Sequence, residues 1–281
     1  MTWFEETLYP VVGQRFKVER VLFREKTEHQ ELVIFENPVF GRVLALDGVI
    51  QTTEGDEFVY HEMLTHVPIL AHGAARRVLI VGGGDGGMLR ELLKHRAIER
   101  VTMVEIDRAV IDLCARYIPG ICGRAFEDPR LDLVIADGCR WVAETSQTFD
   151  VIIVDSTDPM GPGEVLFTQE FYADCRRRLT PGGLLVTQNG VPFLQPQELR
   201  NTRARMGALF ADVACYIAAV PTYYGGFMAF GWGCDDPARR RLTLDEIRPR
   251  AAAAALETRY YTPEIHIGAF ALPKFVADLV A

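Results

Sequence analysis

Runs of apolar residues separated by polar turns dominate the middle of the chain. Residues 78–81 are consecutively apolar and three of them are β-branched, which is typical of a parallel strand buried on both faces. Similar runs predict strands at residues 101–104, 131–136, 151–154, 184–187, 213–220 and 227–232. Apolar residues at helical spacing and capping residues predict helices at residues 58–70, 88–93, 107–117, 139–144, 196–210 and 244–255. This alternation predicts an α/β fold with a mostly parallel sheet.

Shorter runs in the first fifty residues predict antiparallel strands. They lie at residues 16–23, 32–35 and 41–46. Asp47-Gly48, which follows the third run, is a sequence typical of a type I′ hairpin turn. We therefore expect a small antiparallel β domain over residues 1–55 and a larger α/β domain over residues 56–281. The small domain is then placed to cover the mouth of a site in the larger one or to mediate dimerisation.

Five glycines occur within six positions directly after the strand at 78–81. Gly82, Gly84 and Gly87 fit the spacing G-x-G-x-x-G, which indicates a strand-to-helix turn around a nucleotide. Glu105 ends the next strand, where an acid can accept hydrogen bonds from ribose hydroxyls. Dehydrogenases and enzymes of sulfonium nucleosides share this layout. Asp85 would repel a pyrophosphate and attract a cation, which favours the sulfonium class, although an Asp in a tight turn can also simply cap a helix.

Acidic residues follow two later strands. Asp155 and Asp158 come directly after the β-branched run at 151–154, and Asp137-Gly138 follows the strand at 131–136. Ligands bind at the carboxyl ends of such strands, where Asp137 can accept a hydrogen bond from an adenine amino group or cap the next helix. If Asp85 lies in the same cleft, three buried acids need a cation to offset their repulsion. The cluster therefore predicts a positively charged substrate.

The helix predicted at 58–70 carries two histidines. His61 and His66 are five residues apart, so they point about 140° from each other and cannot chelate one metal as an i, i+4 pair does. Metal ligation is therefore disfavoured, and the polar residues of this helix either line a cleft or face solvent. Tyr60 and His61 are candidates for lining a cleft.

Composition narrows the classes of function. The 281 residues carry a formal net charge of −8, which argues against nucleic acid and is compatible with a cationic substrate. The six cysteines form no C-x-x-C pair, so neither a zinc site nor a disulfide framework is indicated. Glu5 and Glu6 stand where a signal peptide would be basic, and no apolar run is long enough to cross a membrane. We expect a cytoplasmic protein.

Taken together, these segments resemble the spermidine synthases, which are polyamine aminopropyltransferases, and most closely their bacterial members. The resemblance covers nearly the whole chain. It rests on EKTEHQ at residues 25–30, ALDGVIQ at 45–51, DEFVYHEM at 56–63, GGGDG at 82–86, VEID at 104–107, DSTDP at 155–159 and PTYYGG at 221–226. The family implies a Rossmann-like, methyltransferase-type doubly wound sheet with a small N-terminal antiparallel β domain, in a homodimer or homotetramer.

The resemblance also implies roles for individual residues. Asp155 would be the catalytic base. Decarboxylated S-adenosylmethionine, the cosubstrate, would be held by Gln30, Glu105, Asp137, Gly138 and Pro162, with Gly82 and Gly84 of the glycine loop. The diamine would contact Tyr60, His61, Asp85, Asp158 and Tyr223. From the residues alone, Tyr223 and Tyr224 are equally well explained as core or interface aromatics.

The expected reaction is transfer of an aminopropyl group to putrescine, giving spermidine and 5'-methylthioadenosine by in-line displacement with an Asp base. The leaving group is a neutral thioether, so no metal or other cofactor is expected. Two alternatives stay open: a methyltransferase that uses ordinary S-adenosylmethionine, whose carboxylate Asp85 would repel, and a binding protein without turnover. The acceptor also stays open among putrescine, cadaverine, agmatine and spermidine. The loop at 156–165 is a candidate lid.

Overall fold

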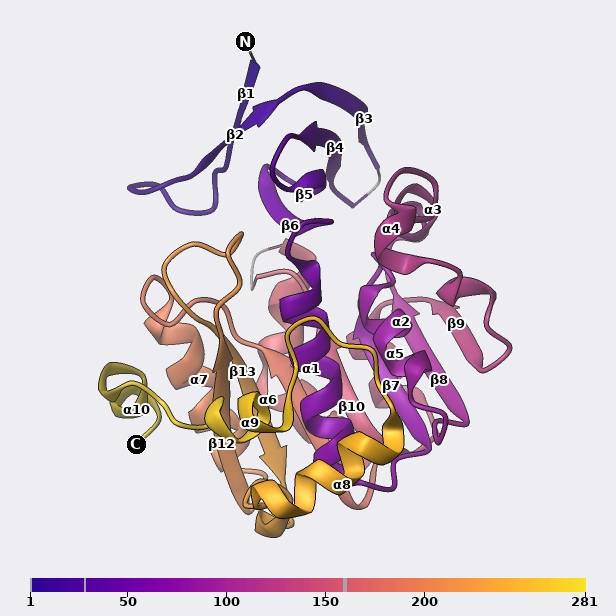
Figure 1. Cartoon of the computed structure of the whole chain (residues 1–281), viewed down its shortest axis with the longest axis vertical. Coiled ribbons are helices and arrows are strands. Elements are labelled where there is room, and N and C mark those ends of the chain that lie inside the picture. Colours follow the sequence, from indigo (N-terminus) through magenta and orange to yellow (C-terminus); the bar gives the residue numbers. More distant parts are fainter. Residues whose placement is uncertain (1, 28, 159–160) are drawn as a thin grey trace.

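The N-terminal strands form a small layer at one end of the molecule, above a larger layered part (Figure 1). The computed structural model describes residues 2–27, 29–158 and 161–281, and the side chains of residues 161 and 162 lie outside this description. A two-stranded antiparallel sheet consists of β1 (Thr2–Glu5) and β2 (Arg15–Val18). A four-stranded antiparallel sheet consists, in spatial order, of β3 (Arg20–Lys26), β4 (Glu31–Asn37), β5 (Gly41–Leu46) and β6 (Val49–Thr53).

The predicted hairpin turn joins β5 to β6. Leu46 pairs with Val49, so the loop holds only Asp47 and Gly48. Both residues have positive φ, 47° and 82°, as a type I′ turn requires. The Asp47 side chain also accepts a hydrogen bond from the backbone N–H of Glu31 at 2.8 Å, which fixes the turn against β4. The sequence thus predicted this hairpin correctly.

A seven-stranded sheet forms the centre of the larger part. Its strands are, in spatial order, β12 (Asp212–Ala218), β13 (Met228–Cys234), β11 (Leu179–Gln188), β10 (Phe149–Asp155), β7 (Arg77–Gly82), β8 (Arg100–Glu105) and β9 (Leu131–Ile135). The pairs from β11 to β9 are parallel, and β13 is antiparallel to both of its neighbours. Strand order reverses between β7 and β10, so this is the doubly wound, Rossmann-like arrangement expected from the sequence.

Helices cover both faces of this sheet. They are α1 (Glu57–His72), α2 (Gly87–Lys94), α3 (Arg108–Tyr117), α4 (Pro119–Cys122), α5 (Gly138–Glu144), α6 (Gln169–Arg177), α7 (Pro196–Gly207), α8 (Leu244–Ala254), α9 (Pro263–Gly268) and α10 (Lys274–Val280), with short 3-10 turns at Ala125–Glu127, Gly161–Phe167 and Pro237–Arg239. Alternate residues of β7 point to opposite faces: Val78 and Ile80 pack with α1 and α2, whereas Leu79 and Val81 pack with α5, α6 and α7. None of the helices in the described ranges is long and apolar enough to cross a membrane.

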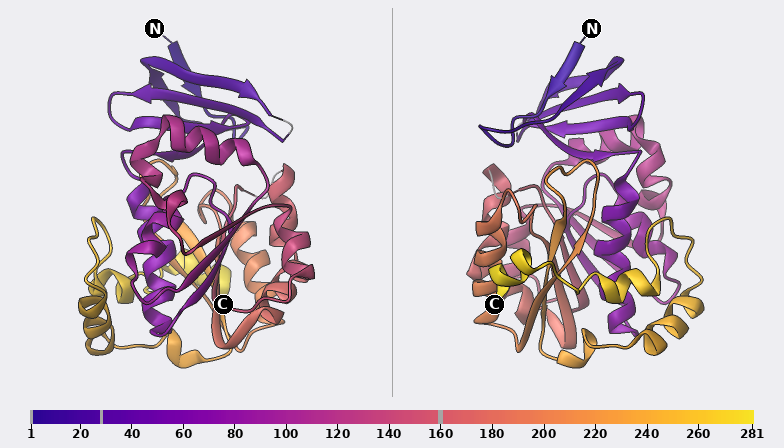
Figure 2. Two further views of the ribbon diagram at one scale, coloured as in Figure 1. Left: turned by 90° about the vertical axis from the view of Figure 1, so that its right-hand side faces the viewer. Right: turned by 60° about the vertical axis from the view of Figure 1, so that its left-hand side comes forward.

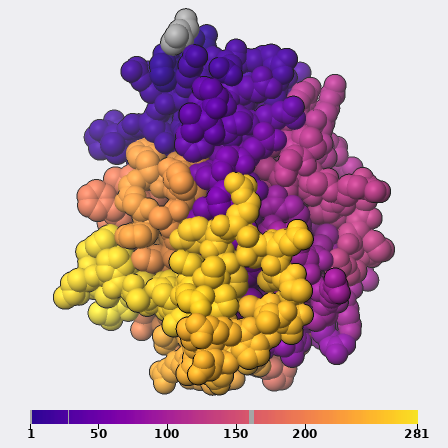
Figure 3. Space-filling model, viewed as in Figure 1, coloured from indigo at the N-terminus to yellow at the C-terminus, as the bar shows by residue number. Residues whose placement is uncertain are grey.

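The N-terminal sheet is joined to the larger part by an apolar cluster. Leu32 and Leu44 of the small sheet pack against Val110 and Cys114 of α3 and Ile121 of α4. Both views in Figure 2 show α3 directly beneath the N-terminal strands. Segments distant in the sequence also meet, because the side chain of Gln14 donates to the carbonyl of Thr222 at 2.7 Å. The space-filling view shows the indigo N-terminal segment next to the orange one (Figure 3).

Helix α1 is longer and more buried than its pattern indicated. It lies between the central sheet and the helices α2 and α8, so even Glu62 and His66 are almost fully enclosed. Glu62 accepts hydrogen bonds from the backbone N–H groups of residues 259–261, and His66 contacts Glu91 and His95. The alternative of a solvent-facing surface helix is therefore wrong, because hydrogen-bonded polar groups can be buried at little net cost.

Several predicted boundaries are wrong. The strand predicted at residues 16–23 is divided between β2 and β3, which belong to different sheets. The strand predicted at 184–187 is longer, because β11 begins at Leu179 and contains residues 181–183 as an irregularity in its pairing with β10. The helix predicted at residues 107–117 is followed directly by a second, short helix. Helix α3 does end at Tyr117, but Pro119 then starts α4, where its fixed φ suits the first helical position. The division of the chain after residue 55 stays a prediction, with β6 ending at Thr53 and α1 beginning at Glu57.

Candidate active site

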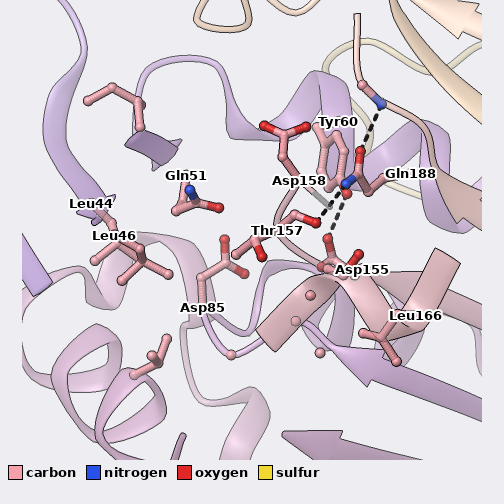
Figure 4. Close-up of a pocket in the computed structure, with 18 of the residues that line it drawn as sticks. Leu44, Leu46, Gln51, Tyr60, Asp85, Asp155, Thr157, Asp158, Leu166 and Gln188 are labelled. Carbon is pink, nitrogen blue, oxygen red and sulfur yellow. Dashed lines mark hydrogen bonds between the residues drawn. The ribbon is translucent and has the colours of Figure 1, made fainter. Parts of the chain in front are cut away.

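The site lies where the strand order reverses, at the carboxyl ends of β7 and β10. Asp155 pairs with Gly82 there, so the acid and the glycine loop are adjacent by register. A cavity of about 190 Å³ opens at this point. Leu44, Leu46 and Gln51 of the N-terminal sheet cover it, and Asp85, Asp155 and Asp158 stand around the same space (Figure 4). The small domain therefore covers the site, which is one of the two roles that the sequence led us to expect for it.

All but one of the residues proposed from the sequence line this cavity. They are Gln30, Tyr60, His61, Gly82, Gly84, Asp85, Glu105, Asp137, Gly138, Asp155, Asp158 and Tyr223. The side chain of Pro162 and part of the candidate lid at 156–165 lie outside the described residues. Within those residues, no three His, Cys, Asp or Glu side chains are grouped as metal ligands would be. The binding roles of the lining residues remain proposals, argued below.

The glycine loop is shaped by close packing. Gly82 has a φ of 86°, and a Cβ atom there would lie 2.1 Å from the carbonyl oxygen of Asp155. A Cβ atom on Gly87 would lie 2.2 Å from the imidazole of His61. Larger residues at these positions would push apart β7 and β10, or α2 and α1. The glycines thus allow the loop backbone and the side chains of His61, Asp85 and Asp155 to lie close together.

Asp155 is one of the three Asp residues that face the cavity, and its pKa is raised. The hydroxyl of Tyr60 donates a hydrogen bond to its Oδ1 at 2.7 Å (Figure 4). Burial, and then the negative charge of Asp85, raise the pKa of Asp155 from 3.8 to about 6, against the opposing effects of His61 and Tyr60. Because Tyr60 occupies Oδ1, Oδ2 is the oxygen available to a substrate.

The sequence left open whether Asp85 caps a turn or faces a cation, and the structure is compatible with both. Its Oδ1 accepts a hydrogen bond from the backbone N–H of Gly87 at 2.8 Å, as a capping residue does. Its Oδ2 lies 3.3 Å from Nε2 of His61, and the carboxylate also lines the cavity. Burial alone would raise the pKa of Asp85, but His61 and the Gly87 N–H outweigh burial and lower it. Asp85 is therefore ionised beside a more weakly acidic Asp155.

Asp158 and Tyr223 line the same cavity. Gln195 donates to Oδ1 of Asp158 at 2.9 Å, although burial still raises the pKa of Asp158. The Tyr223 hydroxyl donates to the carbonyl of Gln51, and its ring meets the Tyr60 ring edge-on with centroids 5.7 Å apart. Tyr223 is thus a packed aromatic and also a wall of the cavity, which the sequence alone could not decide.

The other side of the cavity suits a nucleoside. Oε1 of Glu105 accepts the backbone N–H of Asp107 at 2.9 Å, and burial raises the pKa of Glu105 to about 7. Gln30 donates to Asp107 at 3.3 Å, which places its amide beside Glu105. Asp137 caps α5 by accepting the N–H of Arg140 at 3.0 Å, and it also lines the cavity. Apolar walls from Val81, Ile106, Val110 and Leu166 lie between these polar groups.

Several residues in or near the cavity were not identified from the sequence. Gln195 orients Asp158, and Gln188 donates to the carbonyl of Thr157 at 3.0 Å, which holds the start of the loop (Figure 4). Asp56 accepts the N–H of Thr222 at 2.7 Å and so fixes the loop that carries Tyr223. Glu6 and Tyr9 line the outer part. Their partners are distant in sequence, so no local pattern marked these contacts, although Asp56 lies in the stretch at 56–63 already singled out.

Comparisons with known proteins agree on one family over the whole chain. Residues 57–242 match the spermine/spermidine synthase domain, and residues 2–54 match the spermidine synthase tetramerisation domain. Polyamine aminopropyltransferase 1 of Pseudomonas aeruginosa is 61% identical over 280 residues, covering 100% of this chain and 98% of the relative. The polyamine aminopropyltransferase of Yersinia pestis is 58% identical, covering 98% of this chain and 93% of the relative.

Solved structures give the same result. A spermidine synthase in complex with the transition state analogue AdoDATO superposes with a TM-score of 0.94 at 37% identity, covering 99% of this chain and 94% of that one. Spermidine synthase from Thermotoga maritima superposes with a TM-score of 0.91 at 35% identity, with the same coverage. Fold, acidic cavity and full-length similarity agree, and the chain belongs to the spermidine synthase family of polyamine aminopropyltransferases.

Proposed function

We propose that this protein is a spermidine synthase, which transfers the aminopropyl group of decarboxylated S-adenosylmethionine to putrescine. The observation that carries the proposal is the convergence of Asp85, Asp155 and Asp158 on one cavity whose other side suits a nucleoside. The donor carries a sulfonium and an ammonium, and the acceptor arrives as a diammonium ion. Three acids offset the mutual repulsion of these cations and hold them in one place.

The donor would lie along the carboxyl ends of β7, β8 and β9. Glu105 would accept hydrogen bonds from the ribose hydroxyls, with the Gln30 amide beside it. Asp137 and the backbone at Gly138 would receive the adenine, and Gly82 and Gly84 would let the nucleoside approach the backbone closely. The aminopropyl group would then extend toward Asp85. Pro162 retains its proposed contact with the donor.

Asp155 would accept the proton that activates the amine. A primary ammonium has a pKa near 10.4, so its proton moves to an ordinary Asp only against about 6 pKa units. With the pKa of Asp155 raised to about 6, the gap shrinks by about 2 units, which corresponds to about 3 kcal/mol. Oδ2 would take the proton while Tyr60 holds Oδ1. Tyr223, His61 and Asp158 would line the path of the diamine.

The displacement balances without a redox partner. The amine lone pair forms the new N–C bond to the propyl carbon, and the C–S bond breaks with its electron pair going to sulfur. The products are spermidine, neutral 5'-methylthioadenosine and a proton that Asp155 passes to solvent. Because the sulfonium leaves as a neutral thioether without help from an acid or a metal, the reaction needs no cofactor, and we propose that the enzyme uses none.

Assembly and location follow from coarser observations. A match to a tetramerisation domain supports an oligomer, and we propose a homodimer or homotetramer. The six cysteines, all within the described ranges, are free thiols, which supports our proposal of a reducing, cytoplasmic location. We propose putrescine as the acceptor ahead of cadaverine, agmatine and spermidine, and neither nucleic acid nor membrane as a partner.

Product analysis tests the proposal. Purified protein is incubated with each acceptor and with either decarboxylated or ordinary S-adenosylmethionine, and the products are identified by mass spectrometry. We expect spermidine and 5'-methylthioadenosine from putrescine with the decarboxylated donor alone, because Asp85 repels the carboxylate of the ordinary donor. A methylated amine from the ordinary donor would instead establish a methyltransferase, and absence of turnover with every acceptor would leave a binding protein.

A further inference from the structure

Both ring nitrogens of His61 face carboxylates. Nδ1 lies 2.6 Å from Oε2 of Glu57, one helical turn earlier in α1, and Nε2 lies 3.3 Å from Oδ2 of Asp85. All three side chains are largely buried, and the ring is almost fully enclosed. A neutral imidazole carries one N–H, so one of its nitrogens would direct a lone pair at an anion. The doubly protonated ring gives each carboxylate a donor.

The ring has little freedom to escape this arrangement. Gly87, at the start of α2, packs so closely that a Cβ atom there would lie 2.2 Å from the imidazole. The ring of Tyr60 stands edge-on at a centroid distance of 5.4 Å. The charged and titratable groups that face the imidazole are Glu57 and Tyr60 of α1, Asp85 of the glycine loop, Arg90 of α2 and Asp155 of β10.

Glu57 is itself held in the ionised form. Nη2 of Arg90 lies 2.8 Å from the same Oε2 atom that faces His61. Burial alone would raise the pKa of Glu57, but His61 and Arg90 outweigh burial and lower it. Positive and negative side chains thus alternate along a series of contacts that runs from Arg90 of α2 through Glu57 and His61 to Asp85 at the cavity. An ordinary core histidine would need only one neutral partner, whereas this chain of contacts ends on a substrate-facing acid.

We propose that Glu57 is a positioning residue that keeps His61 doubly protonated and thereby keeps Asp85 ionised and directed into the acceptor site. The role of Asp85 toward the amine rests on the proposed function, whereas the state of His61 does not. The positive ring also faces Asp155 and opposes the rise of its pKa caused by burial and Asp85. Loss of the ring charge would therefore raise the pKa of Asp155 further and move the onset of base catalysis to higher pH.

Glu57→Gln is the direct perturbation. The new amide carries no charge, so one of the two anions that hold the second ring proton is lost. A neutral ring would keep its one N–H on Nε2, which faces Asp85, and Nδ1 would accept from the amide NH2. Glu62→Gln is the matched control, because Glu62 is an equally buried acid of α1 that binds the backbone of residues 259–261 and lies apart from the cavity lining.

Nitrogen-15 NMR of the histidine rings measures the protonation state of His61 directly and needs no catalysis. The resonances of His61 are assigned by their loss in His61→Gln. In the wild type and in Glu62→Gln, we expect both ring nitrogens to be protonated from pH 6 to pH 8. In Glu57→Gln, we expect the neutral ring at pH 7.5. A neutral His61 in the wild type at pH 7 would overturn the proposal even if Glu57→Gln cannot be folded.

Steady-state kinetics give the functional reading. For Glu57→Gln we expect the KM for putrescine to rise about tenfold and the acid limb of the pH–rate profile to move upward by about one pH unit. Glu62→Gln should change neither. Unchanged KM and pH profile in Glu57→Gln would refute the positioning role. If the wild type makes no spermidine while its His61 is doubly protonated, the proposed function fails but the assigned state of His61 stands.

Discussion

Asp155→Asn is expected to stabilise the unliganded protein while it removes activity. The wild-type carboxylate is buried beside Asp85, and its pKa is raised from 3.8 to about 6. Between these values the folded protein binds more protons at this position than the unfolded chain does. The contribution of Asp155 to the free energy of unfolding of the wild type therefore falls as the pH rises through this window, and it changes no further above pH 6. Asparagine has almost the same shape, can still accept the Tyr60 hydrogen bond and carries no charge.

The size of the effect follows from the raised pKa. A difference of about 2 pKa units corresponds to about 3 kcal/mol at pH 8, and to roughly half of that at pH 5. At roughly 2 °C per kcal/mol for a chain of this size, the variant should melt about 6 °C higher at pH 8. In contrast, kcat should fall by on the order of 10²-fold or more, because the amine loses its base.

Thermal melting at pH 5 and pH 8, with turnover measured on the same preparations, tests both halves. Asp150→Asn is the control on the same strand. The pKa of Asp150 is lowered because backbone N–H groups of Arg76 and Arg77 and the Thr180 hydroxyl outweigh burial, so this variant should lose stability. A destabilised Asp155→Asn at pH 8 would refute the electrostatic reasoning, and near wild-type turnover would remove Asp155 from the mechanism.

Three further outcomes are expected. The kcat/KM for putrescine should fall about tenfold per pH unit below pH 6, where Asp155 is protonated, and a flat pH–rate profile down to pH 5 would contradict this. Asp158→Asn should raise the KM for putrescine about tenfold and leave the Kd of 5'-methylthioadenosine unchanged in calorimetry, and a weaker nucleoside complex would move Asp158 to the donor side. Glu105→Gln should weaken the binding of 5'-methylthioadenosine about tenfold without changing the KM for putrescine, and unchanged nucleoside affinity would exclude the ribose contact.

The sequence predicted the parts of the fold that local chemistry determines. Four consecutive β-branched residues at 151–154 form the centre of β10, and the positive φ of Asp47 and Gly48 follows from the residues that a two-residue hairpin requires. The sequence also placed Asp155 and the glycine loop at the same edge of the sheet, because both follow parallel strands, and the pairing of β7 with β10 then brings Asp155 beside Gly82. These features depend on residues close in sequence or on sheet register.

What the sequence missed depends on contacts between distant segments. Gln195 reaches Asp158 across 37 positions, and Asp56 reaches Thr222 across 166, so neither pairing leaves a local pattern. The burial of α1 likewise comes from packing against helices far along the chain. The sequence could not show whether Asp85 caps a turn or faces the cavity, and in the structure it does both: Oδ1 accepts the Gly87 N–H, and the carboxylate lines the cavity.

A crystal structure of the protein with putrescine and 5'-methylthioadenosine would be the most direct test of the proposed mechanism. The decisive measurement is the distance from the putrescine nitrogen that lies nearer the sulfur of the nucleoside to Oδ2 of Asp155. We predict about 3 Å, with the ribose hydroxyls at hydrogen-bond distance from Glu105 and the amine facing the sulfur side of the nucleoside. An amine bound away from Asp155, or a ribose away from Glu105, would contradict the proposed mechanism.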